Sequence, residues 1–522
     1  MKACVVVPAR DEEELIGACI AALADQRGVA REDFAVLLVL DRCTDATEQR
    51  AREAAGTLNL RIIEATEPGV GHARRQGMDL AAELLPPDGL IATTDADSEP
   101  AKDWLKTQLE AVALGARAIG GRIELGAHDL PPAALRRREA DAAIRHAALV
   151  GAGAREHHQF SGASLAVTAA TYAKVGRLEP RAALEDEGFE RALHRHGVPI
   201  ERLAAVRVTT SGRRFGRAGR GLAVDLRRNS WLAERNYRAG DFTLHELLAV
   251  KDRSVSVILP TREVAATLPH IRDALRPLHE LIDELLVVDA DSRDGSAQIA
   301  HDRGVWVQSE SALQRQFGAA LGKGDAMWRA LSATTGEIVC FLDTDTEDFD
   351  AGFALGMLGP LLTHPELAFV KGHFHRPFRV GGTTEPHGGG RVTELLARPY
   401  LNLHFPELAG FRQPLAGELA ATRALLEQLP FPVGYGVEIA NLIDAHRLVG
   451  LERMAQVDLG TRQTRHQPLA ALSRMALEVL AAAERRTHAS DAVPGPLLTP
   501  VGDDFEVRAA LTDERPPLVT MH

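Results

Sequence analysis

The chain has 522 residues, of which 45% are hydrophobic and 25% charged, so it is long enough for two or more globular domains. Its formal net charge of −12 argues against nucleic acid or an anionic membrane as the main partner. The four cysteines form no CxxC pair and fit no zinc-binding spacing. No apolar run approaches the ~18 residues of a membrane span. We expect a cytoplasmic protein with reduced thiols and no signal peptide.

One series of strand ends occurs twice along the chain. Apolar runs end at proline or aspartate in the same order in each half, at Pro8, Asp41, Asp95 and Asp97 and then at Pro260, Asp289, Asp343 and Asp345. The interval from Asp41 to Asp95 equals the interval from Asp289 to Asp343. A repeat of such long period predicts two copies of one domain.

Each half alternates nearly all-apolar strand-like runs with helical stretches, which is typical of an α/β fold with a parallel sheet covered on both faces. Acidic residues at the carboxyl ends of such strands lie where open α/β sheets bind ligands. We expect a first domain over residues 1–245, a linker over 246–253 and a second domain over 254–488. A Pro-rich tail over 489–522 is expected to be loosely packed.

In the second half, two carboxylates one residue apart follow an apolar strand at Asp343 and Asp345. Such a pair can share Mg²⁺ or Mn²⁺ with a diphosphate, while the alternative is an Asp-rich turn without a ligand. Lys323 stands between glycines ahead of a helical run, which suits close approach to a phosphate. Asp289 and Asp291 are candidates for uracil or ribose contacts, or for helix capping.

A glycine triplet precedes Arg391 and Thr393 at the start of a further helix. Free backbone N–H groups, a guanidinium and a hydroxyl would form an anion cradle there, and the alternative is a flexible turn with a capping Thr393. Lys371 and Arg376 would add positive charge, or else form surface ion pairs. Glu438, in VGYGVEIAN, is a candidate for hydrogen bonds to sugar hydroxyls or an exposed helix residue.

The strings GGGRVTEL, PELAGFRQPLAGE and VGYGVEIAN resemble the glucosyl-3-phosphoglycerate synthase family over roughly residues 254–475. The resemblance implies a GT-A fold and transfer of glucose from an NDP-glucose, UDP-glucose first, to the 2-hydroxyl of 3-phosphoglycerate with retention. It also implies front-face attack and a Mg²⁺ or Mn²⁺ cofactor. The related mannosyl enzymes, which use GDP-mannose, are the alternative.

The resemblance carries roles over to residues of the second half. The catalytic residues would be Lys323 and Glu438. Donor contacts would come from Pro260, Thr261, Glu263, Asp289, Asp291, Gly322, Lys323, Asp343, Thr344, Asp345, Tyr435 and Arg462. The acceptor would bind Gly389, Gly390, Arg391, Val392, Thr393 and Lys371. Thr464 stands where the family has a metal-binding histidine, so the metal ligands would be Asp343, Asp345 and His466.

The first half resembles glycosyltransferase family 2, inverting enzymes of the same GT-A fold. The resemblance implies donor contacts at Pro8, Asp11, Asp41 and Asp95 and a metal ligand at Asp97. Asp186, with Glu185 as second choice, would be the general base, and a carboxylate at a helix start is the alternative. A loop with Arg213, Arg214, Arg217 and Arg220 would close over the diphosphate or be solvated.

The acceptor of the first half is left open, and this half is alternatively a non-catalytic binding or dimerising module. The partners expected for the chain are a nucleotide sugar and 3-phosphoglycerate, with a homodimer left open. Neither nucleic acid nor a membrane span is expected.

Overall fold

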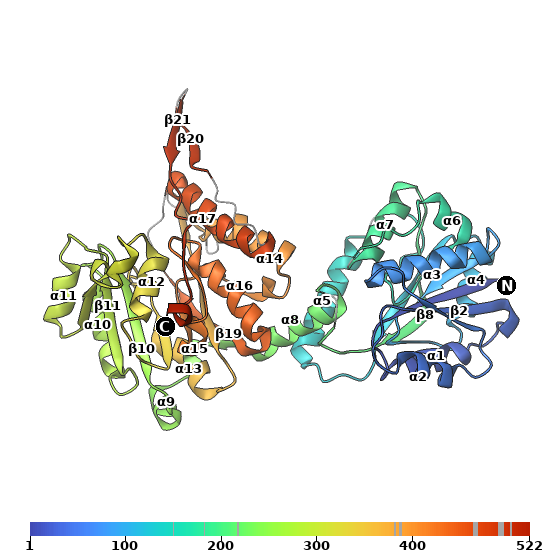
Figure 1. Ribbon diagram of the computed structural model, residues 1–522, viewed down its shortest axis with the longest axis horizontal. Helices are drawn as coiled ribbons and strands as arrows, with labels where there is room; N and C mark the ends of the chain where they lie inside the picture. Colours follow the sequence, from blue (N-terminus) through green and yellow to red (C-terminus); the bar gives the residue numbers. More distant parts are fainter. Residues whose placement is uncertain are drawn as a thin grey trace. The chain divides into compact units, whose positions relative to one another are not determined.

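A computed structural model of the chain describes residues 1–149, 151–181, 183–216, 219–380, 383–385, 389–462, 468–488, 495–501 and 504–521. These residues form two compact units, Met1–Ser230 and Trp231–His522, and Figure 1 colours the chain along its sequence. The division lies inside α8 (Leu222–Glu234), earlier than the expected boundary after residue 245. It lies there because β9 (Asn236–Arg238) pairs with β19 (Met454–Thr461) in the second sheet.

The first unit is built on an eight-stranded sheet of order β3-β2-β1-β4-β7-β6-β8-β5. The strands are β1 (Ala3–Ala9), β2 (Phe34–Leu40), β3 (Leu60–Glu64), β4 (Leu90–Thr93), β5 (Ser98–Pro100), β6 (Ala118–Leu125), β7 (Leu165–Thr168) and β8 (Glu201–Thr210). The helices are α1 (Ile16–Ala24), α2 (Thr47–Ala55), α3 (Val70–Leu84), α4 (Trp104–Ala113), α5 (Pro132–Ala147), α6 (Ala169–Lys174) and α7 (Glu185–Arg195). β1 pairs in parallel with both β2 and β4, while β7 runs antiparallel to β4.

The second unit repeats this plan in a sheet of order β12-β11-β10-β13-β17-β14-β19-β9. Its further strands are β10 (Val255–Thr261), β11 (Glu284–Asp289), β12 (Trp306–Ser309), β13 (Ile338–Phe341), β14 (Phe369–His375) and β17 (Leu419–Thr422). Its helices are α9 (Leu244–Val250), α10 (Leu268–Leu275), α11 (Ser296–Asp302), α12 (Lys323–Leu331), α13 (Ala351–Thr363), α14 (Arg398–His404), α15 (Arg423–Leu426), α16 (Val437–Val449) and α17 (Leu469–His488). The predicted α/β class and the repeat are confirmed, because seven of the eight strands hold corresponding places in the two sheets, and only the last strands, β5 and β9, do not correspond.

Each sheet separates two hydrophobic cores. In β10, Ile258 faces one core of the second unit, while Val257 and Leu259 face the other. Successive strand residues point to opposite faces, so a strand buried on both sides must be apolar throughout. This burial explains the continuous apolar runs of the sequence.

Two expectations about connecting segments are wrong. Residues 246–250 form most of α9 rather than a linker, and Leu247 is buried in the core of the second unit. The chain after residue 488 is not loosely packed throughout, because β22 (Glu514–Arg515) pairs with β18 (Phe431–Pro432). Arg515 is held there by a bidentate ion pair with the buried Asp325.

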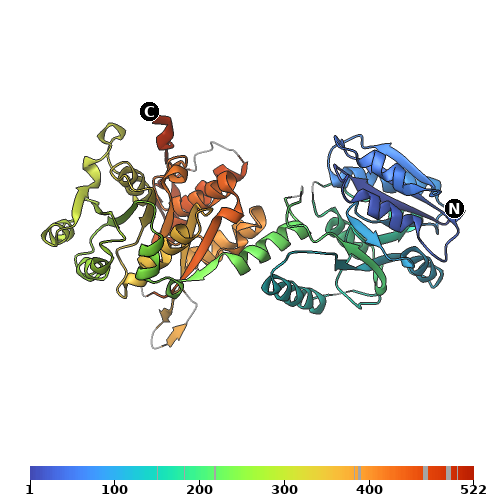
Figure 2. The same ribbon diagram turned by 90° about the horizontal axis from the view of Figure 1, so that it is seen from below.

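Two hairpins extend from the second unit. β20 (Leu497–Val501) and β21 (Asp504–Arg508) project from its body in Figure 1, and β15 (Phe378–Val380) with β16 (Thr383–Glu385) does so in Figure 2. None of the helices in the described part of the chain is long and apolar enough to cross a membrane.

Candidate active site

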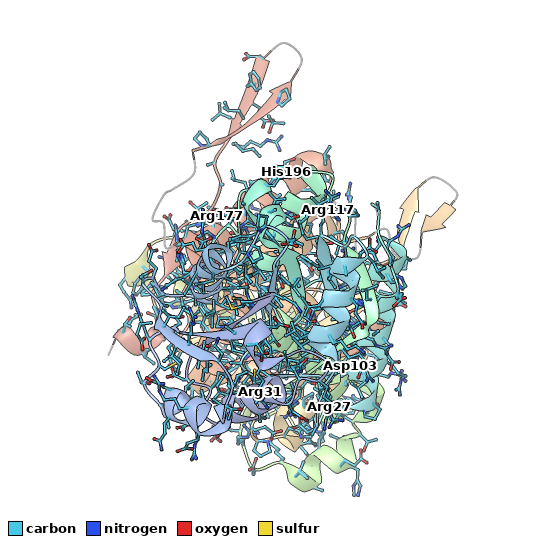
Figure 3. The ribbon with its side chains drawn as sticks, turned by 90° about the vertical axis from the view of Figure 1, so that its right-hand side faces the viewer. Arg27, Arg31, Asp103, Arg117, Arg177 and His196 are labelled. Carbon is cyan, nitrogen blue, oxygen red and sulfur yellow. The ribbon has the colours of Figure 1, made fainter. Side chains whose placement is uncertain are left out.

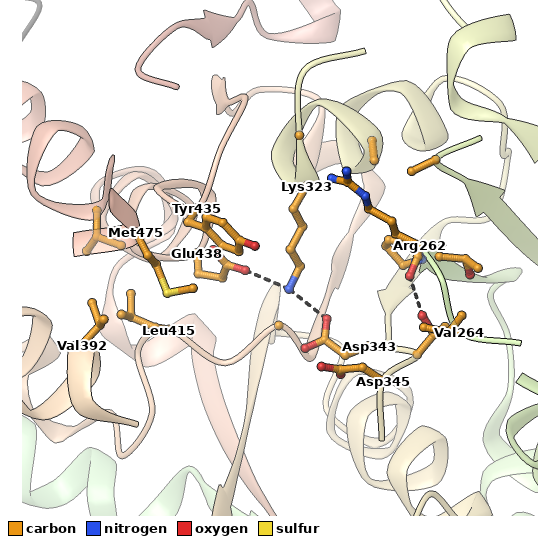
Figure 4. A pocket seen from close by; sticks show the side chains of 18 of the residues that line it. Arg262, Val264, Lys323, Asp343, Asp345, Val392, Leu415, Tyr435, Glu438 and Met475 are labelled. Carbon is orange, nitrogen blue, oxygen red and sulfur yellow. Dashed lines mark hydrogen bonds and ion pairs between the residues drawn. The ribbon is translucent and has the colours of Figure 1, made fainter. Parts of the chain in front are cut away.

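A cavity of about 540 Å³ opens where β10 and β13 end in the second unit. Fifteen of the residues predicted to bind ligands line it together: Pro260, Thr261, Asp291, Gly322, Lys323, Asp343, Thr344, Asp345, Gly389, Gly390, Arg391, Val392, Thr393, Tyr435 and Glu438. Figure 4 shows Lys323, Asp343, Asp345, Tyr435 and Glu438 converging on this space. Because parallel strands end at one edge of the sheet, residues far apart in sequence meet there.

Lys323 joins two walls of the cavity. It opens α12, and its ammonium donates to Asp343 Oδ1 at 2.8 Å and to Glu438 Oε1 at 2.9 Å (Figure 4). Burial alone would lower the pKa of Lys323, but the charges of Asp343 and Glu438 outweigh that effect and raise it. Lys323 is therefore a firmly protonated cation facing the cavity.

The start of α12 lies unusually close to its neighbours because of a glycine. A Cβ added to Gly324 would collide with the carbonyl oxygen of Pro432 in β18. The amide of Asp325 in turn donates to the carbonyl of Val433 at 3.2 Å. Gly324 thus lets the start of α12 approach the segment that leads to Tyr435 and Glu438.

Arg462, which follows β19, holds the two predicted metal-binding carboxylates. Its guanidinium lies 2.8 Å from Asp345 Oδ1 and 3.5 Å from Asp343 Oδ2, and it also pairs with Glu418. Burial would raise the pKa of Asp343, but Lys323 and Arg462 hold it well below its usual range. Asp343 is therefore ionised. Arg462 does not line the cavity, so it supports Asp343 and Asp345 from behind.

Gly417 and Glu418 are parts of the site that the sequence analysis missed. A Cβ on Gly417 would lie 2.3 Å from both carboxylate oxygens of Asp343 and 2.4 Å from Lys323 Nζ. Only a glycine fits there without displacing the ion pair. Glu418 is 1% exposed and is the buried anion that Arg462 neutralises. The PLAGE string contained both residues, but nothing local in it indicated these contacts.

Lys371 does not line the cavity, contrary to the acceptor contact predicted for it. It belongs to β14, is 1% exposed, and its Nζ has no hydrogen-bond partner among the described residues. Burial lowers the pKa of Lys371 to about 8, although Glu438 opposes the shift. Both faces of β14 are buried here, so neither face would place this side chain in solvent.

Glu263 and Asp289 also lie outside the cavity lining and organise a loop. Asp289 Oδ2 accepts from the amide of Ser292 at 2.8 Å, and Glu263 Oε1 accepts from the amide of Arg293 at 2.9 Å. These hydrogen bonds hold the loop ahead of α11 and do not cap that helix, which begins at Ser296. Asp291 keeps its place in the lining, where Oδ1 accepts from Ser309 Oγ at 2.6 Å.

The glycine-rich segment also lines the cavity. Gly390 has φ +72°, a left-handed conformation that favours glycine, and the π-helical turn Thr393–Ala397 follows it. Arg391 and Thr393 line the space together with Arg376. These two arginines give this part of the lining positive charge in a chain that is acidic as a whole. Gly388, Thr464, Arg465 and His466 lie outside the described residues, so the third metal ligand stays a prediction.

The first unit carries a second group of buried charges at the ends of its strands. Arg74 pairs with Asp95 at 2.7 Å and with Glu185 at 3.0 Å, while Arg213 pairs with Asp97 at 3.0 Å. Gly162 is needed here, since a Cβ would collide with the Arg74 guanidinium. The predicted residues Asp95 and Asp97 are thus each paired with an arginine.

Asp186 lies at the start of α7, where Oδ2 accepts from the amide of Gly162 at 3.1 Å. Burial, reinforced by Glu185, raises the pKa of Asp186 to about 6. A carboxylate with such a pKa suits a general base near neutral pH.

The remaining predicted residues of the first unit lie on the same strand ends. Pro8 is in β1, Asp41 Oδ2 accepts from the amide of Gly69 at 2.9 Å, and Asp11 Oδ1 accepts from the amide of Thr44 at 2.6 Å. Asp11, Cys43 and Asp45 offer ligand atoms within 4.8 Å of one another, and their acceptors are used by loop amides.

Charged side chains elsewhere on this unit form ordinary surface pairs. Arg27 lies 3.9 Å from Asp25, and Arg177 lies 3.6 Å from Asp79; Figure 3 labels both arginines.

In the basic loop, Arg213 pairs with Glu12 and Asp97 and Arg214 with Asp129, while Arg217 is outside the described residues.

Comparison with known proteins gives two kinds of match. A family model described as "Glycosyl transferase family 2" matches residues 4–150 and 256–415, a stretch of each unit. Glucosyl-3-phosphoglycerate synthase of Mycolicibacterium smegmatis is 41% identical over 298 residues, which cover 56% of this chain and 98% of that protein. That length exceeds the first unit, so the match extends into the second.

Two solved structures resemble the chain at similar coverage. Mannosyl-3-phosphoglycerate synthase from Rubrobacter xylanophilus is 43% identical with a TM-score of 0.51, over 56% of this chain and 98% of that chain. Glucosyl-3-phosphoglycerate synthase from Mycobacterium tuberculosis, in complex with Mn²⁺, UDP-glucose and phosphoglyceric acid, is 38% identical with a TM-score of 0.50. This second match covers 54% of this chain and 96% of that chain.

Proposed function

Because the chain belongs to glycosyl transferase family 2 and is a hexosyltransferase, we propose that its second unit transfers glucose from UDP-glucose to the 2-hydroxyl of 3-phosphoglycerate. The transfer retains the anomeric configuration and yields glucosyl-3-phosphoglycerate. One observation carries the proposal. A single cavity is lined by Asp343, Asp345, Lys323 and Glu438 and by the cationic glycine-rich segment. A divalent cation on the two aspartates would bind a diphosphate donor, and the arginines of the segment suit a phosphorylated acid.

Asp343 and Asp345 are the residues that would hold Mn²⁺ or Mg²⁺. Their carboxylate oxygens are hard ligands of the kind these cations prefer, and both line the cavity. The related enzyme from M. tuberculosis contains Mn²⁺ beside UDP-glucose. When bound, the cation offsets the charge of the diphosphate and favours its departure. His466 remains our candidate for a third ligand.

Lys323 stabilises the leaving group in this proposal. Its ammonium already lies between two carboxylates and is preorganised toward the space beside Asp343, where a diphosphate would develop charge. Glu438 orients the glucose through charge-assisted hydrogen bonds to its hydroxyls. The acceptor hydroxyl attacks from the face that the diphosphate leaves, so the new C1–O bond forms as the bond to the diphosphate breaks. The departing phosphate oxygen takes the hydroxyl proton, and no residue acts as a nucleophile.

The acceptor phosphate binds at the glycine-rich segment. Arg391 and Thr393 line the cavity there, and Gly390 has no side chain to obstruct an approaching phosphate, whereas the N–H of Gly389 already donates to the carbonyl of Arg376. A phosphate bound at this segment would orient the 2-hydroxyl of the acceptor toward the donor sugar.

Transfer of mannose from GDP-mannose to the same acceptor is the second candidate. The observation that favours it is the R. xylanophilus mannosyl enzyme, whose identity of 43% is as high as that of the glucosyl relatives. Assays with a panel of sugar nucleotides distinguish the two candidates, because they share the acceptor and differ in the donor.

For the first unit we propose a second glycosyltransferase domain with its own acceptor. Asp186 would act as general base, and Asp97 would bind the cation. The buried Arg74 and the paired aspartates support this assignment over a purely structural module, since such charges are costly to bury without a function.

The test compares matched double substitutions in the two units. Asp343→Ala with Asp345→Ala should reduce glucosyl transfer to 3-phosphoglycerate by at least about a thousandfold. Asp95→Ala with Asp97→Ala should leave that reaction intact if the units act separately. Undiminished turnover in the first variant would refute the assigned site, and loss of turnover only in the second would move the reaction to the first unit.

A further inference from the structure

A C-terminal strap, defined as residues 511–516, lies along the segment that leads into the cavity lining. Its strand β22 pairs with β18, with Arg515 opposite Phe431 and Glu514 opposite Pro432. The amide of Val433 donates to the carbonyl of Asp513 at 2.9 Å. The strap therefore holds the backbone immediately before Tyr435.

Glu478 of α17 connects the strap to the cavity lining. Its Oε2 accepts from the amide of Tyr435 at 2.9 Å, and its Oε1 accepts from the amide of Leu511 in the strap at 3.1 Å. Glu478 is 1% exposed, so solvent cannot replace either hydrogen bond. One carboxylate thus binds two backbone segments that no other described side chain joins in this way.

Two glycines bring the lining segment close enough for this contact. A Cβ on Gly434 would lie 2.3 Å from Glu478 Oε2, and a Cβ on Gly436 would lie 2.6 Å from the Cβ of Ala482. The segment from 433 to 436 is therefore packed directly against α17, and Glu438 follows at the start of α16.

The strap also contacts the start of α12. Arg515 donates to both oxygens of Asp325 at 2.8 Å, and Asp325 is fully buried two residues after Lys323. The indole of Trp328 donates to the carbonyl of Pro516 at 2.9 Å. One short segment therefore anchors both the helix of Lys323 and the segment of Tyr435.

From these contacts we infer that Glu478 and the C-terminal strap position Lys323, Tyr435 and Glu438 for glycosyl transfer. The inference rests on the function proposed above for this cavity. Neither Glu478 nor Arg515 lines the cavity, so both act through the residues they hold. The ion pair of Lys323 with Glu438, at 2.9 Å, links the two segments that the strap anchors. Loosening the strap should disturb this geometry without removing any group that touches a substrate.

The test uses the full chain with Glu478→Gln, Arg515→Lys and the control Glu484→Gln. Glutamine offers one acceptor oxygen, so either the Tyr435 or the Leu511 amide loses its partner. Arg515→Lys keeps the charge but loses the two-point contact with Asp325. Glu484 lies on the same helix α17, but its carboxylate accepts from the Tyr400 hydroxyl at 2.8 Å instead of from the strap.

Two readouts separate positioning from general stability. Hydrogen exchange should increase about tenfold or more in peptides covering 433–437 and 509–516 in both test variants. The kcat for glucosyl transfer should fall roughly tenfold to a hundredfold, with KM for UDP-glucose changed less than about threefold. Glu484→Gln should change neither quantity.

The outcomes distinguish this inference from the proposed function. Increased exchange with an unchanged kcat, or unchanged exchange in both variants, would overturn the positioning role while leaving the proposed transfer intact. An equal fall in kcat for Glu484→Gln would also overturn it, since the effect would then not depend on the strap. Absence of transfer by the wild-type chain would overturn the proposed function, and the inference with it.

Discussion

Arg213 in the first unit and Arg462 in the second have the same relationship to a pair of aspartates. Each follows the strand at the corresponding place of its sheet, β8 or β19, and each contacts the second aspartate, Asp97 at 3.0 Å or Asp345 at 2.8 Å. In each unit the arginine supplies a countercharge to the aspartate, although Asp97 is largely buried and the Asp345 side chain is 64% exposed. The repeat thus extends beyond the strands to the electrostatics of each site.

Removal of Arg462 should be strongly destabilising. Arg462→Met leaves Glu418 as an unpaired buried carboxylate, which should cost about 3–5 kcal/mol of unfolding free energy. Urea denaturation, followed through the unfolding transition of the second unit, measures this loss. The double variant with Glu418→Gln should recover most of the loss, because no unpaired charge remains. If the double variant is as unstable as the single one, Glu418 is not the cause.

Substitution of Gly417 should impair transfer although glycine carries no functional group. The Cβ of Gly417→Ala would displace Asp343 or Lys323, so we expect kcat/KM to fall roughly a hundredfold. Gly240→Ala is the matched control, because a Cβ there meets nothing within 4 Å and its φ is not positive. Steady-state kinetics with both variants checks the expectation, and full activity of Gly417→Ala would contradict it.

Lys371 should make stability depend on pH in the alkaline range. Its pKa is lowered from 10.5 to about 8 by burial, so between pH 8 and 10.5 the unfolded chain binds a proton that the folded chain does not. Stability must therefore rise with pH across this window, and below it the buried charge has its full cost. Lys371→Met should be more stable than wild type at pH 7 by roughly 1–3 kcal/mol, and this advantage should shrink by pH 10.

Denaturant titrations at pH 7 and pH 10 measure that difference. Lys106→Met serves as the control, because Lys106 is exposed on α4 and its difference from wild type should be the same at both pH values. An advantage of Lys371→Met that stayed constant from pH 7 to pH 10 would show that Lys371 does not titrate as described.

The sequence allowed the fold and much of the cavity lining to be predicted because both follow from local pattern. Apolar strands ending in Asp343 and a glycine-flanked Lys323 imply a sheet edge and a helix start, and parallel strands bring such ends together. Lys371 was misplaced because its strand was recognised but the face it occupies was not. The boundary after residue 245 was wrong because β9 is only three residues long and its partner lies far along the chain.

The supporting contacts could not be predicted in the same way. Glu478, Arg515 and Glu418 act through partners that are distant in sequence, and charged residues in helices or loops are normally exposed. Only the folded chain reveals that they are buried and paired. The residues that face ligands thus follow local motifs, whereas those that hold them in place depend on tertiary packing.

The most direct test of the account is the identity of the product. The chain is incubated with 3-phosphoglycerate, Mn²⁺ and, separately, UDP-glucose, GDP-glucose and GDP-mannose, and the product is analysed by mass spectrometry and by NMR of the anomeric centre. We predict an α-linked glucosyl group on the 2-hydroxyl of 3-phosphoglycerate, formed from UDP-glucose and absent when Asp343 and Asp345 are replaced by alanine. A β-linked product, or no transfer from any of these donors, would contradict the account.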